Sequence, residues 1–136
     1  MTTLNDLADG LQARLATISG LHSYSEPAER PHEPSAEVID LGRRRDDASG
    51  GQVATFGIEI SVSADNRGWS EAVRMLRPYM DPTGASSVEA AIYAEHTLGG
   101  IADWSAVSQV GGIRRVEWGD GFRWSGRVIV EVCYDP

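Results

Sequence analysis

The residue types that most often carry out catalysis or bind metals are few and scattered in this 136-residue chain. The histidines are His22, His32 and His96, and the single cysteine is Cys133. No two histidines fall in an HxxxH, HxH or HExxH pattern, which would bring two metal ligands onto one face of an element. The sequence therefore predicts no metal site, no cofactor and no catalytic residues, and we interpret the histidines as surface or loop residues.

Glycine pairs are the second feature that could support chemistry, because the backbone N–H groups of glycine-rich loops can bind phosphate. They occur in "LGGI" (98–101), "VGGI" (110–113) and "WGDGF" (118–122). None matches GxGxxG or GxxxxGK[ST], and the GxSxG pattern of serine hydrolases is absent. We interpret these glycines as turn and bulge positions. One enzymatic alternative stays open, a small hydrolase or metal-dependent enzyme that uses His96 with Asp103.

A cluster of arginines could contact a partner macromolecule. Arg43, Arg44 and Arg45 lie in "RRRDD", within a polar segment over 42–51 that we expect to be flexible and exposed. Such side chains suit phosphates or an acidic partner. The alternative is a solvated loop whose own aspartates neutralise the arginines.

Two tryptophans form the other candidate contact. Trp118 and Trp124 flank the turn "GDG" (119–121), and two such large side chains near a hairpin tip cannot both lie deep in a small core. Tryptophan is enriched at interfaces as well as in cores. An interface role and a core role both stay open for this pair.

The composition limits the class of protein. A chain of this length is expected to form a single domain over 1–136 with its own core. The net charge of −8 argues against general nucleic-acid binding, because an acidic body is repelled by duplex phosphates. The lone cysteine favours a reducing compartment. We find neither a signal peptide nor an apolar run near the ~18 residues of a membrane span, so no membrane partner is expected.

The elements that position these residues follow from hydrophobic periodicity. We predict a helix over 3–19 with Thr3 as its N-cap, strands over 21–26, 36–41 and 52–63, a helix capped by Ser70 through about Arg77, a short helix over 88–95, and a hairpin of 105–118 and 122–134. Trp69, Ala72, Val73 and Leu76 are expected on the inner side of the second helix. The order α–β–β–β–α–α–β–β predicts an α+β fold, a mostly antiparallel or mixed sheet with about three helices packed on one face.

The stretch "RPYMDPTGASSVEAAI" (77–92) contains two prolines and a glycine between two helical patterns. Its prolines are expected to stop one helix, its glycine to permit a turn, and a capping box of Ser86 with Glu89 to start the next helix. We interpret it as a structural corner formed by Pro78, Tyr79, Asp81, Gly84, Ser86 and Glu89.

The corner belongs to an ordered pattern that runs from about Leu4 to Val132. It consists of the helix ending in "TISGL", the proline-rich region, the strong strand, "LRPYMDPTGASSVEAAI" and "LGGIADWSAVSQV". This pattern resembles the tail terminator (tail completion) proteins of long, non-contractile-tailed bacteriophages (siphophages), most specifically over 76–101. Met80 departs from the leucine expected before the aspartate.

The resemblance implies a structural protein and not an enzyme. Such a subunit would assemble in the host bacterial cytoplasm as a homo-hexameric ring at the head–tail junction of the virion. The ring would cap the major tail tube protein, end its polymerisation and face the head–tail connector protein. DNA would pass through the lumen without sequence recognition, and an acidic wall would keep the duplex sliding. A head-completion or adaptor protein on the portal side is the alternative within the same class.

Overall fold

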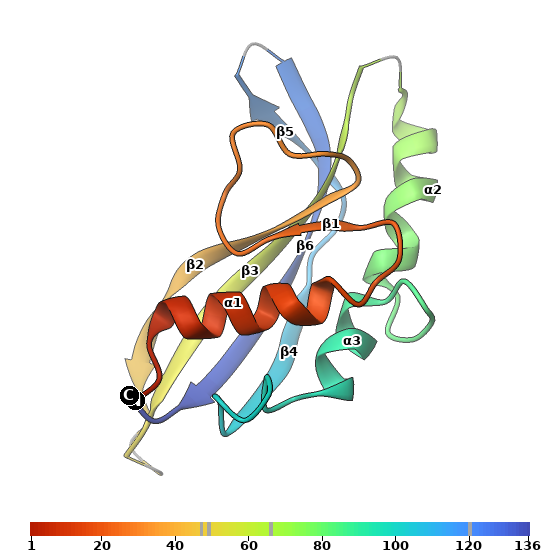
Figure 1. The fold of residues 1–136 in the computed structure, drawn as a ribbon. Helices are drawn as coiled ribbons and strands as arrows, with labels where there is room; N and C mark the ends of the chain where they lie inside the picture. The colour runs from red at the N-terminus through yellow and green to blue at the C-terminus, as the bar shows by residue number, and fades with distance from the viewer. Residues whose placement is uncertain (47, 49, 66, 120) are drawn as a thin grey trace.

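The fold is a mixed sheet with a layer of helices on one face (Figure 1), in a computed structural model that describes residues 1–46, 48, 50–65, 67–119 and 121–136. The strands are β1 (His22–Tyr24), β2 (Ser35–Arg45), β3 (Gln52–Ser63), β4 (Trp104–Val110), β5 (Arg114–Trp118) and β6 (Gly121–Tyr134). The helices are α1 (Leu4–Leu15), α2 (Trp69–Met80) and α3 (Val88–Ala94). The predicted α+β class and order are confirmed.

The sheet is built around two long central strands. Its order is β1-β2-β3-β6-β4, and β5 pairs with the first part of β6. Among the described strands, β1 and β2 pair in parallel and the other pairs are antiparallel. β3 and β6 pair along their whole common length, from Gln52 opposite Tyr134 to Ser63 opposite Arg123. The two ends of this ladder therefore lie at opposite ends of the molecule.

The two faces of the sheet differ in what covers them. Alternate residues of β3, among them Phe56, Ile58 and Ile60, face the helices and join the hydrophobic core with Leu7, Leu76 and Ile92. We call this side the helix-covered face. The opposite side, from which Glu59 and Ser61 project, we call the open face. α1 lies over β1 and β2, whereas α2 lies over β3 and β6.

Three helix boundaries differ from those predicted. α1 has the predicted Thr3 cap, with reciprocal Thr3–Asp6 hydrogen bonds, but it ends at Leu15, where the Thr17 hydroxyl donates to the Arg14 carbonyl at 2.6 Å. α2 is capped by Gly68 instead of Ser70 and continues through Pro78 to Met80. Because Pro78 lies in the last turn, the helix loses only one donor there.

Two strand predictions are also corrected. The segment predicted as a flexible loop over 42–51 is strand in its first part, because β2 continues to Arg45. Asp46 closes the remaining turn with Gly50 and Gly51, whereas residues 47 and 49 lie outside the described part. The arm predicted over 105–118 is two strands, interrupted where the N–H of Gly111 donates to the Arg127 carbonyl at 2.7 Å.

Candidate partner-binding surfaces

The corner at 77–92 joins α2 to α3 through a serine that bonds in both directions. The N-cap of α3 is Ser87 and not Ser86, so the predicted capping box with Glu89 is wrong. The Ser87 hydroxyl donates to the Asp81 carbonyl at 2.6 Å and accepts from the Ala90 N–H at 3.0 Å. Ser87 is buried, whereas Ser86 is not, so the serine that caps α3 is the buried one of the pair.

Other residues of the corner fix its turn and pack against the core. Gly84 has φ of 112°, which favours glycine. Val88 and Ile92 are fully buried in the core, and the partly buried Tyr79 packs against it. Burial raises the pKa of Tyr79, which keeps its hydroxyl neutral. The corner therefore holds α2 and α3 against the sheet.

The predicted arginine contacts lie at one end of the sheet. Arg43, Arg44 and Arg45 pair with the start of β3 and are all exposed. Arg43 donates to the Gln52 side chain at 2.9 Å. Because successive strand residues alternate between faces, Arg44 points to the opposite side from its two neighbours. The three arginines therefore lie at the end of strand β2, with charge on both faces of the strand, and not in a loop as predicted.

The predicted tryptophan contacts lie at the other end of the sheet, on opposite faces of the β5–β6 hairpin. Trp118 is exposed at the end of β5, and the Arg123 guanidinium lies 3.8 Å from the centre of its ring. Trp124 is half-buried and packs edge-on against Trp69 and Phe122. The structure therefore does not bring Trp118 and Trp124 together, and Asp120 of their turn lies outside the described residues.

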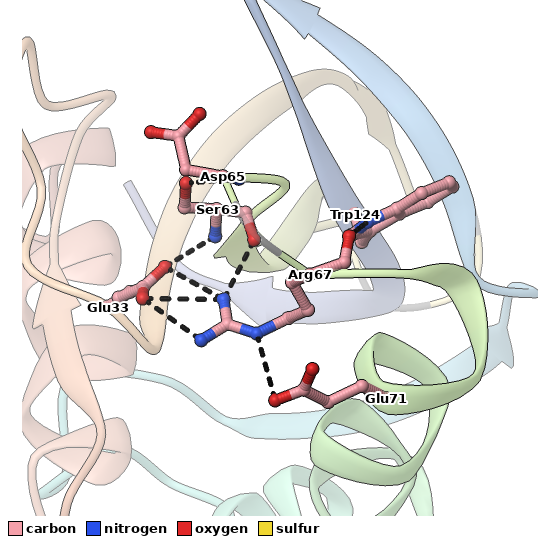
Figure 2. A network of polar contacts seen from close by, with 6 residues as sticks. All are labelled: Glu33, Ser63, Asp65, Arg67, Glu71 and Trp124. Carbon is pink, nitrogen blue, oxygen red and sulfur yellow. Dashed lines mark hydrogen bonds and ion pairs between the residues drawn. The ribbon is translucent and has the colours of Figure 1, made fainter.

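A strap over 25–34 runs from β1 to β2 and is held by a polar network (Figure 2). The Arg67 guanidinium lies 3.3 Å from the Glu33 carboxylate and donates to the Ser63 carbonyl at 2.7 Å. The same carboxylate accepts from the Ser63 N–H. Arg67 in turn accepts, through its carbonyl, the indole N–H of Trp124 at 3.3 Å. The network ties the strap to the start of α2.

Burial and hydrogen-bond donors have opposite effects on the pKa of the Glu33 carboxylate. Burial alone raises its pKa, but the Ser63 N–H and the Arg67 guanidinium together outweigh it, so the net pKa lies below the ordinary value. On the far side of Arg67, Nε lies 3.8 Å from the Glu71 carboxylate, close enough for ion pairing but too long for a hydrogen bond. The strap is therefore pinned by a charged carboxylate at neutral pH.

The open face carries two buried glutamates side by side, since Glu37 and Glu59 are register partners on β2 and β3. Like charges in such positions repel. Arg127 lies 2.8 Å and Arg114 lies 3.1 Å from Glu59. Arg123 lies 3.4 Å from Glu37. Burial lowers the pKa of Arg123, although the negative charges of Glu37 and Glu33 raise it in part. The arginines neutralise a face that none of the described helices covers.

These surfaces present charged and aromatic side chains to solvent. Among the described residues, no group of three or more histidine, cysteine, aspartate or glutamate side chains is arranged to hold a metal ion. His96 and Asp103 are both exposed, and each uses its backbone, His96 accepting from Ser105 and Asp103 donating to Cys133. No described helix is long and apolar enough to cross a bilayer.

One tryptophan lies elsewhere than the sequence predicts. Trp69 was expected on the inner side of α2 beside Ala72 and Leu76, which are buried, yet 49% of Trp69 is exposed. The exposure of Trp69 could have been anticipated from its position, because it is the first residue of α2 and directly follows the Gly68 N-cap. The edge-on packing of Trp69 against Trp124 depends on a contact between α2 and β6, which periodicity within either element cannot reveal.

Comparisons with known proteins add no assignment. No protein-family model matches the chain, and no curated protein matches it either.

Proposed function

We propose that this chain is the structural subunit of a bacteriophage tail terminator, a homo-hexameric ring that caps the tail tube at the head–tail junction. The observation that carries the proposal is the ordered residue pattern over 76–101. That pattern forms one unit, the α2–α3 corner, in which the Asp81 carbonyl and Ser87 hydroxyl are bonded at 2.6 Å. The order of residues in the pattern therefore corresponds to a defined joint between two helices.

The distribution of candidate contacts supports a subunit with a different neighbour at each end. Exposed Arg43, Arg44 and Arg45 lie at the end of the sheet where Gln52 meets Tyr134. Exposed Trp118 lies at the end where Ser63 meets Arg123. A ring subunit between a tail tube and a head–tail connector needs two such separate surfaces. Which end meets which neighbour is decided by cross-linking in intact particles.

The charge balance supports a ring through which DNA passes without specific recognition. The chain carries a net charge of −8, which repels the duplex and opposes tight binding in a lumen. The ring would form in the bacterial cytoplasm and remain in the virion. A head-completion or adaptor protein on the portal side has the same requirements and is the second candidate. A small hydrolase, with His96 and Asp103, is the third.

Deletion of the gene separates these candidates. Loss of a terminator removes the stop to tube polymerisation, so electron microscopy should show overlong tails. Loss of a portal-side adaptor should leave tails of normal length and heads that leak DNA. Gold labelling of complete particles should place the wild-type chain at the head-proximal end of the tube. Label along the tube or at capsid vertices contradicts the proposal.

A further inference from the structure

An exposed tryptophan sits beside two exposed arginines on α2. Trp69, Ser70, Val73, Arg74 and Arg77 line a shallow hollow, which we call the tryptophan–arginine surface. Arg74 and Arg77 are three residues apart and so share a helix face. Neither has an ion-pair partner among the described residues, although Arg67, Arg114, Arg123 and Arg127 each have at least one. The two charges therefore face outward unneutralised.

Trp69 is held in place from beneath by other aromatic rings. Its ring centre lies 5.2 Å from that of Trp124, which lies 5.4 Å from that of Phe122, both in edge contacts. Trp124 is itself fixed by its indole hydrogen bond to the Arg67 carbonyl. A large side chain that is exposed but already ordered loses little entropy on binding, and tryptophan with arginine is the typical composition of an interface hot spot.

A hollow of opposite charge lies between α1, the strap and β2, at the β1–β2 side of the sheet. Its apolar lining includes Leu4, Ala8 and Pro27, and its carboxylates are Asp9, Glu26 and Asp40; we call it the acidic hollow. These carboxylates come from α1, the strap and β2, and all three are exposed. None has an ion-pair partner among the described residues, so an outside cation would relieve their mutual repulsion.

The acidic hollow fits side chains better than a metal ion. Its carboxylates do not belong to any metal-holding group within the described part of the chain. Its lining is mostly polar, and Leu4, Ala8 and Pro27 contribute apolar side chains to it. Carboxylates beside a few apolar side chains complement an exposed tryptophan flanked by arginines, chiefly in charge. Guanidinium groups also match carboxylates geometrically.

We propose that the tryptophan–arginine surface of one copy docks in the acidic hollow of the next copy. This inference rests on the proposed ring and names the two surfaces that would form it. α1 covers the β1–β2 side and α2 the β3–β6 side (Figure 1), so one copy presents both surfaces in different directions. Contact between two different surfaces is head-to-tail, and such contacts generate closed rings or open filaments.

Charge reversal tests the pairing directly. The first variant is Arg74→Glu with Arg77→Glu, and the second is Asp9→Arg with Asp40→Arg. Sedimentation of the purified wild-type chain should show concentration-dependent species larger than a monomer. Each variant alone should lose this association, because both of its surfaces then carry the same sign. An equimolar mixture should associate again, because every contact between the two variants joins opposite charges.

The two variants control for each other, since they shift the net charge in opposite directions. Loss of association in both therefore cannot come from overall repulsion. Thermal unfolding by circular dichroism checks that both remain folded, as expected for exposed positions. Trp69→Ala should raise the dissociation constant at least tenfold, whereas Trp104→Ala, at a tryptophan of comparable exposure on β4, should not.

Several results would overturn the pairing. They are a wild-type chain that stays monomeric up to millimolar concentration, variants that associate as the wild type does, and a mixture that stays monomeric. A single-stranded oligonucleotide that binds the wild type but not Arg74→Glu/Arg77→Glu would assign the surface to nucleic acid instead. Normal-length tails after gene deletion would reject the terminator role, yet leave a restored association in the mixture intact as evidence for the interface.

Discussion

The two faces of strands β3 and β6 are buried by different physical means. On the helix-covered face, Phe56, Ile58 and Ile60 lie beneath helices, and the burial of apolar surface supplies the stabilisation. On the open face, Glu59 and Ser61 are nearly as inaccessible, yet they are covered by arginine side chains and by their neighbours in the sheet. Ser61 and Ser125 share a hydrogen bond of 2.6 Å there.

The difference shows that low accessibility does not by itself define a core. The helix-covered face gains free energy from each buried carbon atom, whereas the open face mostly recovers the cost of removing carboxylates from water. Substitutions on the two faces should therefore differ in size even at similar burial. The following predictions test that contrast in order of decreasing effect.

Phe56→Ala should have the largest effect, a loss of about 3–5 kcal/mol in the free energy of unfolding, because it leaves a cavity beneath the helices. Phe56 is 1% exposed within the core. Thr55→Ala, one residue along β3 and on the open face, should cost under about 1 kcal/mol. Urea denaturation measures both, and equal losses would remove the distinction between the faces.

The two tryptophans of the β5–β6 hairpin provide a second contrast between faces. Trp124→Ala should cost about 2–3 kcal/mol, because it removes two ring contacts and the bond to the Arg67 carbonyl. Trp118→Ala loses mainly its contact with the Arg123 guanidinium, worth about 0.5–1 kcal/mol. Thermal and urea unfolding of the pair check the order, and a larger effect at Trp118 would reverse our assignment of the faces.

Glu59→Gln should cost about 1–2 kcal/mol, below the ~3–5 kcal/mol typical of a broken buried ion pair. The reason is that Arg114 and Arg127 lose a counter-charge but still reach solvent, with 45% and 31% of their side chains exposed. Glu117→Gln, at an exposed position on β5, serves as the control. Equal urea midpoints for the two variants would show that the open-face network contributes nothing to stability.

Glu33→Gln should change the pH dependence of stability more than stability itself. Since the folded-state pKa of Glu33 lies below its ordinary value of 4.5, the unfolded chain takes up the proton first as the pH falls. The carboxylate thus contributes stability above pH 4.5 that is lost as the pH falls through the folded pKa. The wild type should lose its advantage over Glu33→Gln between neutral and acidic pH, whereas Glu29→Gln, an exposed strap residue, should track the wild type.

Replacement of Arg43, Arg44 and Arg45 by alanine should have the smallest effect on folding, within about 0.5 kcal/mol, because all three are exposed. Their expected role is contact with a partner or DNA. Particle assays should therefore show reduced incorporation of the triple variant into tails, while its unfolding curve matches the wild type. Unchanged incorporation would exclude the contact.

Periodicity predicted most of the fold because most elements here have one apolar side. The alternation of β3 and the Thr3 cap were both readable from single residues and their spacing. The predicted helix boundaries were wrong where two neighbouring residues each favoured a different start or end of the helix. Pro78 predicts a helix stop, yet it lies in the last turn of α2. The glutamate three residues after Ser86 predicts a cap at Ser86, yet the cap is Ser87.

The candidate site was less predictable, because its contacts join distant segments. Arg67 meets Glu33 through a bond that spans 34 residues of sequence, and Glu59 meets Arg127 across 68. Charged residues at such separations look like ordinary surface residues in the sequence. Three adjacent arginines stand out in the sequence, whereas the edge-on contact of Trp69 with Trp124 leaves no local pattern.

The unbroken pairing of β3 with β6 also has a mechanical consequence. Interstrand hydrogen bonds lie perpendicular to the strands, and the two hairpins that carry the candidate contacts lie at opposite ends of this ladder. Tension between those ends would load the ladder in shear, so that its bonds must fail together instead of one by one. A subunit pulled between two neighbours would thus resist force along its longest dimension, and single-molecule pulling from the two hairpins should record one high-force rupture.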